Sequence, residues 1–207
     1  MLNLEQLFFN IQNPNDYRNT GHIGTDWKYL EDDNHTYILL KERKTLLNRL
    51  FDLLIIPIPY RFNKKLLWFS FEAYLKTEKT FRFISYDLKY SNLAPKNNKL
   101  YLAGWDNGGS SAIILSILLQ KEYPNLSLHL ITYGTPAVCF GKKTLQTVES
   151  CVTKWNEYLY HNDWIKYFIP LYSRKKSLMV IPKNEPQTLK ERHRIYGKAL
   201  YNPSTAQ

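Results

Sequence analysis

The sequence contains no apolar run long enough to cross a membrane. Its longest apolar runs, residues 50–58 and 112–119, are much shorter than the roughly 20 residues that a membrane-spanning helix needs. The first twelve residues carry Glu5 and no basic side chain, so we expect no signal peptide there. We therefore expect an intracellular protein without a membrane-spanning segment.

Cysteine is scarce as well. The two cysteines, Cys139 and Cys151, cannot supply the disulfide framework of a small secreted protein. We expect both to be reduced thiols, as is usual inside cells. We expect neither a bound metal ion nor a cofactor.

Acidic side chains are in the minority, and the net charge is +10. Residues 1–36 carry six acidic and two basic side chains, whereas residues 166–198 carry nine basic and two acidic ones. The basic C-terminal third, residues 166–207, can therefore face an anionic partner such as phospholipid, nucleic acid or an acidic protein. We single out Arg174, Lys175 and Lys176 as the side chains that would bind it. No nucleic-acid motif accompanies the charge, and a solvated basic face is the alternative.

Length and composition fit one domain spanning residues 1–207. A chain of this length, with 44% hydrophobic and 15% aromatic residues, can bury a sizeable core. Apolar spacing and turn residues predict helices over residues 2–11, 45–54, 110–119, 142–151 and 191–200, and strands over 36–40, 100–103, 126–133 and 157–161. Residues 55–60 are expected at a sheet edge or in a connection, and residues 174–187 in a loop with room for a short strand. This alternation predicts an α/β fold with a mostly parallel central sheet and helices on both faces.

The stretch from residue 99 to 119 organises the chain. A short apolar strand is followed by the sequence G-W-D-N-G-G at residues 104–109, and then by a strongly apolar helix. A buried strand that enters a buried helix through a G-x-D-x-G turn is the arrangement of a nucleophile elbow, in which the middle residue is presented at the top of a sheet. That middle residue is Asp106, where a serine is usual.

This stretch resembles the G-H-S-L-G-G-A-L-A signature of the class-three lipases, the fungal triacylglycerol lipase group of the α/β-hydrolases. Four further segments resemble family motifs in the same order: residues 41–60 (R-G-T-x-S-x-x-D-W-x-x-D-L in the family), 128–136 (a strand ending in F-G-S-P), 161–170 (N-x-x-D-x-V-x-x-x-P) and 193–196 (H-x-x-Y). The resemblance spans roughly residues 27–196. It implies an α/β-hydrolase-like fold, and it is also the main reason to expect a helix over residues 66–85.

The resemblance implies a catalytic triad as well. In the family a serine attacks the ester, a histidine takes its proton and an aspartate orients the histidine. The matching positions here are Asp106, His193 and Asp163. The R-G-T segment, which contributes to the oxyanion hole, corresponds to Glu42, Arg43 and Lys44, and the residue after the nucleophile position is Asn107.

Three departures from the family pattern lie at the site. Asp106 replaces the serine, Glu42 and Arg43 replace glycine and threonine, and residues 68–71 read W-F-S-F where the family has H-x-G-F. We therefore interpret the chain as a catalytically degenerate lipase-like protein, a structural or binding module in a larger assembly or at an anionic surface. Under this interpretation, a lipid-like ligand in the former substrate pocket is a further alternative.

Two enzyme alternatives remain. The elbow is also similar to the G-H-D-W-G-G elbow of epoxide hydrolases and haloalkane dehalogenases, in which the aspartate attacks an sp³ carbon. Against this, the tryptophan is Trp105 and precedes the aspartate, no H-G-x-P motif is present, and little sequence is left for a cap domain. The other alternative is a lipase or esterase silenced by the serine-to-aspartate change alone.

Overall fold

The computed structural model describes residues 2–18, 24–42, 56–90, 93–160, 172–175, 178–182, 188, 196 and 199–201. Its large sheet has seven strands in the order β1-β2-β5-β6-β8-β10-β11. These strands are β1 (Thr25–Glu31), β2 (Thr36–Glu42), β5 (Lys99–Trp105), β6 (Ser127–Tyr133), β8 (Lys154–Tyr160), β10 (Leu178–Pro182) and β11 (Ala199–Tyr201). Every inner pairing is parallel, and the outer pairings β1–β2 and β10–β11 are antiparallel. The expected mostly parallel sheet is confirmed, with antiparallel edges that the sequence analysis did not anticipate.

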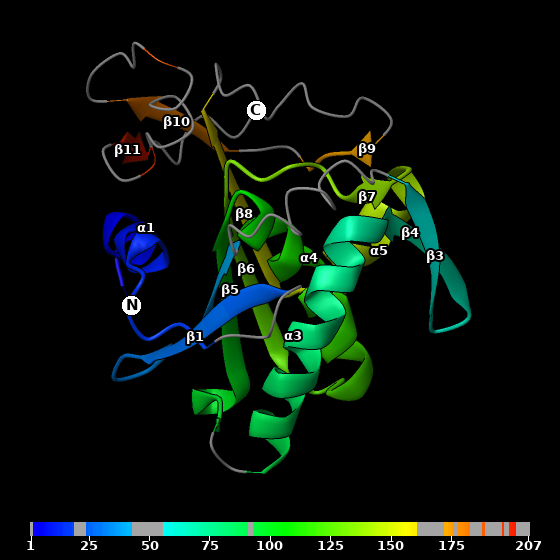
Figure 1. The fold of residues 1–207 in the computed structure, drawn as a ribbon, viewed down its shortest axis with the longest axis horizontal. Coiled ribbons are helices and arrows are strands. Elements are labelled where there is room, and N and C mark those ends of the chain that lie inside the picture. The colour runs from blue at the N-terminus through cyan, green and yellow to red at the C-terminus, as the bar shows by residue number, and fades with distance from the viewer. Residues whose placement is uncertain are drawn as a thin grey trace.

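Helices cover both faces of this sheet, as expected (Figure 1). On one side lies α1 (Leu4–Gln12), and on the other lie α3 (Phe71–Lys89), α4 (Asn107–Glu122) and α5 (Lys142–Cys151). Alternation along the strands explains the two layers: in β2, Ile38 and Leu40 join the core under α4, whereas Tyr37 and Leu39 join the core under α1. The first core is largely aliphatic, and the second contains a cluster of aromatic rings.

Two lysines hold the C-terminal end of α1 on the sheet. Lys41 Nζ donates to the carbonyl oxygen of Gln12 at 2.8 Å, and Lys28 Nζ donates to those of Asn13 and Asn15 at 3.4 and 3.3 Å. Basic groups at this end of a helix satisfy free carbonyls and complement the helix dipole. The helix itself has no basic residue in its last turn, so the strands supply the charge.

The helix expected over residues 66–85 is wrong for its first part, where the structure has a strand of a second, smaller sheet. This sheet has the order β3-β4-β7-β9, formed by β3 (Pro57–Phe62), β4 (Lys65–Ser70), β7 (Cys139–Phe140) and β9 (Tyr172–Ser173). The helix α3 begins only at Phe71, because Asn63 and Lys64 both have positive φ and turn β3 back into a hairpin with β4. Both prolines of β3 lie on an edge strand, where the missing N–H is tolerated.

A second correction concerns the C-terminal end. The helix expected over residues 191–200 conflicts with β11, whose Leu200 pairs with Ile181 of β10. Residues 191–195, and the helix expected over residues 45–54, lie outside the described residues. No helix in the described part of the chain is long and apolar enough to span a membrane.

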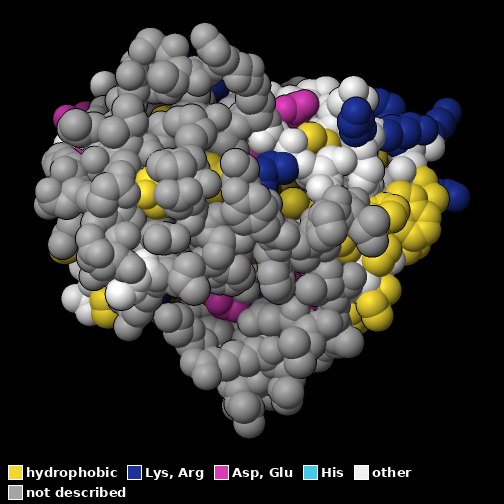
Figure 2. Space-filling view, turned by 90° about the horizontal axis from the view of Figure 1, so that it is seen from above, with side chains coloured by type: hydrophobic (Ala, Val, Ile, Leu, Met, Phe, Trp, Pro, Cys, Tyr) yellow, Lys and Arg dark blue, Asp and Glu magenta, His cyan; other side chains and the backbone are white. Residues whose placement is uncertain are grey.

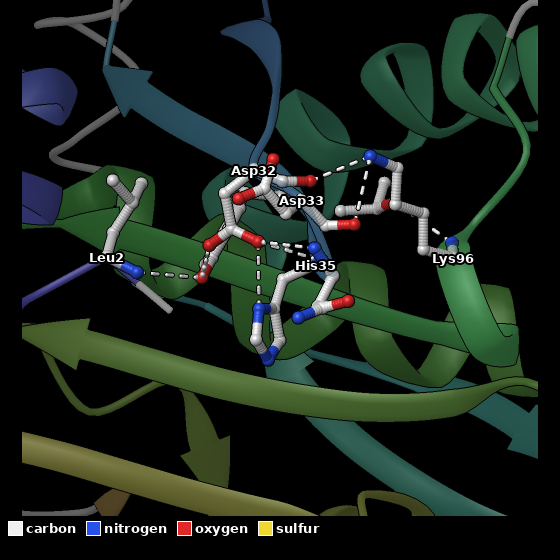
Figure 3. A network of polar contacts seen from close by, with 8 residues as sticks. Leu2, Asp32, Asp33, His35 and Lys96 are labelled. Carbon is white, nitrogen blue, oxygen red and sulfur yellow. Dashed lines mark hydrogen bonds and ion pairs between the residues drawn. The ribbon is translucent and has the colours of Figure 1, made fainter.

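A polar network closes the amino end of β2 (Figure 3). Asp32 Oδ1 accepts from the backbone N–H of His35 at 2.8 Å and lies 2.9 Å from His35 Nδ1, and Asp32 Oδ2 accepts from the Tyr37 hydroxyl at 3.1 Å. Lys96, in the 3₁₀ turn before β5, donates to the carbonyl oxygen of Asp32 at 2.7 Å. The Tyr37 hydroxyl also accepts from the backbone N–H of Leu2. We call these contacts the Asp32 network.

Candidate functional site

The turn between β5 and α4 has the backbone geometry of a nucleophile elbow. Asp106, the single residue between strand and helix, has φ 56° and ψ −132°. Its N–H donates to the carbonyl oxygen of Tyr133 at 3.1 Å, and its own carbonyl accepts from Gly109 N–H at 2.9 Å. A non-glycine residue in this region costs on the order of 1–3 kcal/mol and persists only where its surroundings enforce it. The side chain of Asp106 is half-buried at the first turn of α4.

Two glycines bring the helix close enough to enforce this turn. A Cβ at Gly108 would overlap the carbonyl group of Leu40 in β2, and a Cβ at Gly104 would overlap the carbonyl group of Gly108. Strand and helix therefore pack backbone against backbone on both sides of Asp106. This explains why the G-x-D-x-G spacing predicted the turn correctly.

The serines that follow the turn are buried in α4. Ser110 and Ser111 are each 1% exposed, which removes them as alternative nucleophiles for an external substrate. The hydroxyl of Ser111 is hydrogen-bonded to that of Thr25 at 2.6 Å. The Ser110 hydroxyl has no hydrogen-bond partner among the described residues.

An ionic cluster lies beside the elbow, formed by Glu42, Glu72, Lys76 and Asn107. Glu42, the last residue of β2, accepts from Asn107 Nδ2 at 2.9 Å and from Lys76 Nζ at 3.3 Å. Lys76 Nζ also lies 2.5 Å from Glu72 Oε1, one turn back on α3. The Lys76 side chain is only 2% exposed, so its charge depends on these carboxylates. The cluster ties β2, α3 and the start of α4 together.

The sequence analysis found Glu42 and Asn107 but missed Lys76 and Glu72. Their i, i+4 spacing was visible, yet that spacing usually marks an exposed helix pair. Only the packing of α3 against the carboxyl end of β2 turns it into a buried contact. Arg43, Lys44, Asp163 and His193 lie outside the described residues, so their positions relative to Asp106 stay a prediction.

Arg174 and Lys175 form ion pairs within the protein. Arg174 Nη1 lies 2.6 Å from Glu157 Oε1, a carboxylate that is 3% exposed, and Lys175 Nζ lies 3.1 Å from Glu149 Oε1. Lys176 lies outside the described residues. On the face seen in Figure 2, most of the visible Lys and Arg side chains lie at one edge, on the side of the small sheet and α5. Binding of an anionic partner by Arg174, Lys175 and Lys176 stays a prediction.

The two cysteines are free thiols. Burial, followed by the charges of Glu157 and Glu149, raises the pKa of the Cys139 thiol far above its usual range. A thiol that stays protonated is not a nucleophile at neutral pH. Among the described residues, no group of His, Cys, Asp and Glu side chains is arranged to hold a metal ion.

No protein-family model and no curated protein matches this sequence. Solved structures do match. A fungal lipase–inhibitor complex, described as a model for interfacial activation in lipases, aligns with a TM-score of 0.66 and 16% identity over 81% of this chain and 65% of its own. The lipase from Rhizopus microsporus var. chinensis aligns with a TM-score of 0.62 and 14% identity over 83% and 62%. A triacylglycerol lipase whose catalytic centre is a serine protease triad aligns with a TM-score of 0.59 and 17% identity over 77% and 62%.

These likenesses show the fold. The chain has the α/β-hydrolase architecture of fungal triacylglycerol lipases, as the sequence motifs predicted. It spans less than two thirds of the length of the first neighbours.

Proposed function

We propose that this chain is a catalytically degenerate protein of lipase-like fold, which acts as a structural or binding module. The observation that carries the proposal is a carboxylate, Asp106, at the tip of the strand–turn–helix where lipases of this fold need a serine. A carboxylate is a poor nucleophile toward an ester carbonyl, and the product of its attack would be an anhydride. This turn therefore cannot support ester hydrolysis through a serine acyl-enzyme.

The position of Glu42 supports the same proposal. The free backbone N–H groups at the N-terminus of a helix favour negative charge. Hydrolases use such groups to stabilise an oxyanion that exists only during the reaction. Here Asp106 and Glu42 bring two carboxylates to the start of α4, and the second is hydrogen-bonded to Asn107. Fixed negative charge then occupies the region where an oxyanion would have to develop. In this proposal Asp163 and His193 are remnants of a triad, and Arg43 and Lys44 belong to the altered oxyanion segment.

The module's partner would be a protein assembly or an anionic surface. The +10 net charge and the basic C-terminal third support an anionic partner. A lipid-like ligand in the former acyl pocket is a narrower version of the same proposal.

A second candidate uses Asp106 as a nucleophile on an sp³ carbon. The strained backbone of Asp106 favours it, because strain of this kind is often retained at functional sites. A carboxylate oxygen would bond to an epoxide carbon while the ring C–O bond breaks, its electron pair remaining on the oxygen, which then takes a proton. His193 and Asp163 would activate the water that cleaves the resulting ester.

The deciding experiment compares the natural chain with Asp106→Ser on a panel of short- and long-chain esters and two epoxides. We expect both to be inactive, because Glu42 still opposes an oxyanion after the serine is restored. Ester hydrolysis by Asp106→Ser alone would instead identify a lipase silenced at one position. Epoxide cleavage by the natural chain alone would contradict the proposal and support the second candidate.

Intact-mass measurement gives an independent result. After incubation with an epoxide or an alkyl halide, no adduct should map to Asp106. A covalent adduct that maps to Asp106, and that Asp106→Asn abolishes, would establish Asp106 as a nucleophile.

A further inference from the structure

The outer face of α3 carries an unusual stripe of side chains over its C-terminal half. The exposed positions there are Lys79, Arg82, Phe83, Tyr86, Lys89 and, just past the helix end, Tyr90. Their spacing places them along one face of the helix, since residues three and four apart are neighbours on its surface. Three are cations and three are aromatic. We call this set the α3 stripe.

The aromatic members are exposed to a degree that is rare for such side chains. Phe83 is 52% exposed, Tyr86 60% and Tyr90 53%, and the rings of Tyr86 and Tyr90 lie 4.6 Å apart. They make up half of the large hydrophobic residues that are exposed in the described part of the chain. Apolar side chains gathered on one face, unlike scattered ones, mark an interaction site.

Two of the carboxylates near the stripe are paired with arginines. Glu78 is paired with Arg82 at 2.7 Å, and Asp87 is 9% exposed and paired with Arg18. Glu122, at the end of α4, accepts a hydrogen bond from the Ser85 hydroxyl at 2.6 Å. Because Glu78 offsets the charge of Arg82, the net positive charge of the stripe comes from Lys79 and Lys89, beside three exposed aromatic rings.

The stripe lies far from the elbow. Near the elbow, the first turns of α3 contact the start of α4 through Lys76, Glu42 and Asn107. At the other end, the Tyr123 hydroxyl donates to the carbonyl oxygen of Ser85 at 3.0 Å, so the two helices run side by side in the same direction. The 16 residues of α4 correspond to about 24 Å of helix. In Figure 1, α3 lies in front of α4 as the outermost layer.

We propose that the α3 stripe is a docking surface for an anionic lipid membrane, with the helix lying parallel to the bilayer plane. Aromatic rings with a polar tip prefer the membrane interface, and lysine and arginine side chains beside them are attracted to anionic headgroups. The proposal does not depend on whether Asp106 is catalytic, because the stripe contributes nothing to the elbow.

The shape of the stripe favours a membrane over nucleic acid. Proteins that stack bases on aromatic rings do so in a charged groove that follows the phosphate backbone. The α3 stripe is instead a ridge about 16 Å long on the outside of a helix, and a ridge meets a flat surface along its whole length. Phe83 also offers no hydrogen bond, which suits the acyl boundary of a bilayer.

The test is sedimentation of the full chain with vesicles of ether-linked phosphatidylcholine, with or without about one third ether-linked phosphatidylserine. Ether lipids contain no ester between chain and glycerol, so binding is measured apart from any hydrolysis. We expect binding to the anionic vesicles to be on the order of ten-fold tighter than to the neutral ones, and to weaken in about 0.5 M salt.

Variants of the stripe make the test specific. Phe83→Ser with Tyr86→Ser should weaken binding by on the order of ten-fold, and Lys79→Gln with Lys89→Gln by roughly five-fold for each cation removed. The matched controls are Phe9→Ser, an aromatic ring that is 69% exposed on α1, and Lys142→Gln with Lys143→Gln, two exposed cations on α5. Both controls should bind within two-fold of the natural chain.

Three results would overturn the proposal. The first is no binding to anionic vesicles at low salt. The second is a loss of binding in the control variants equal to that in the stripe variants, which would place the anionic surface elsewhere, for example at the basic C-terminal third. The third is binding of single-stranded polyuridylate, lost in the stripe variants, without binding of vesicles.

Discussion

A polar network lies at each end of strand β2, and the two networks differ in how far their side chains are buried. At its carboxyl end, Glu42 joins the ionic cluster, whose Lys76 is 2% exposed. At its amino end lies the Asp32 network, whose Asp32 and His35 side chains are about one fifth exposed. Water can replace a lost contact at the shallow end but not at the deep one. Similar groups at the two ends of one strand should therefore contribute very different free energies.

Lys76→Met should have the largest effect. It removes the cation shared by Glu72 and Glu42, whose side chains are 10% and 15% exposed, and we expect the free energy of unfolding to fall by about 3–5 kcal/mol at pH 7. Urea denaturation measures this. The matched control is Lys79→Met, one turn further and exposed, which should stay within about 0.5 kcal/mol of the natural chain. Equal effects of the two substitutions would show that the ionic cluster is not buried as described.

Gly108→Ala tests the backbone at the same end of β2. Because the new methyl group would overlap the carbonyl of Leu40, we expect a loss of about 2–3 kcal/mol in the free energy of unfolding. The control is Gly141→Ala, where nothing lies within 4 Å but φ is +81°, so that backbone strain alone should cost on the order of 1–2 kcal/mol. A larger loss at Gly141 than at Gly108 would contradict the close approach of α4 and β2.

Asp106→Gly and Asp106→Ala separate the strain of the elbow from the contacts of its side chain. Both variants lose those contacts, but only glycine adopts φ 56° and ψ −132° without a steric penalty. Asp106→Gly should therefore be more stable than Asp106→Ala by about 1–2 kcal/mol in thermal or urea unfolding. Equal stability of the two variants would mean that the turn relaxes once the carboxylate is gone.

The elements that depend on local residue spacing were predicted correctly from the sequence. The elbow, the strand that became β6 and the helix Lys142–Cys151 follow from turn residues and apolar periodicity, and the structure has each of them. The lipase-like fold followed from motif order, and the solved structures confirm it. The hairpin of β3 and β4 was missed because positive φ at Lys64 is not a usual property of lysine.

Long-range contacts were beyond the sequence. Nothing near Lys76 indicated that α3 would bring it to the end of β2, and nothing near Leu200 indicated a partner strand in β10. Burial of a charged side chain depends on which elements meet, and the local pattern around Lys76 is that of an ordinary surface pair.

The smallest effect is expected at the shallow end of β2, in Asp32→Asn. Burial alone would raise the pKa of Asp32, but hydrogen bonds from the backbone N–H of Asn34, from the His35 side chain and from the Tyr37 hydroxyl more than offset it, so the pKa is lowered. A carboxyl group whose pKa is lowered by folding stabilises the protein above its unfolded value, about 3.9, and loses that contribution as the pH falls through that value toward the folded one. The variant should therefore be less stable than the natural chain by about 1 kcal/mol at pH 7, and the gap should narrow below about pH 4.

Urea unfolding at a series of pH values measures this gap, and Asp33→Asn is the control, because the Asp33 side chain next to it is exposed. A gap that persists unchanged at low pH would assign the effect of Asp32→Asn to the geometry of the turn instead of its charge. A loss in the free energy of unfolding as large as that of Lys76→Met would contradict the difference proposed between the two ends of β2. It would show that exposure to water does not reduce the free energy lost with an ionic contact in this sheet.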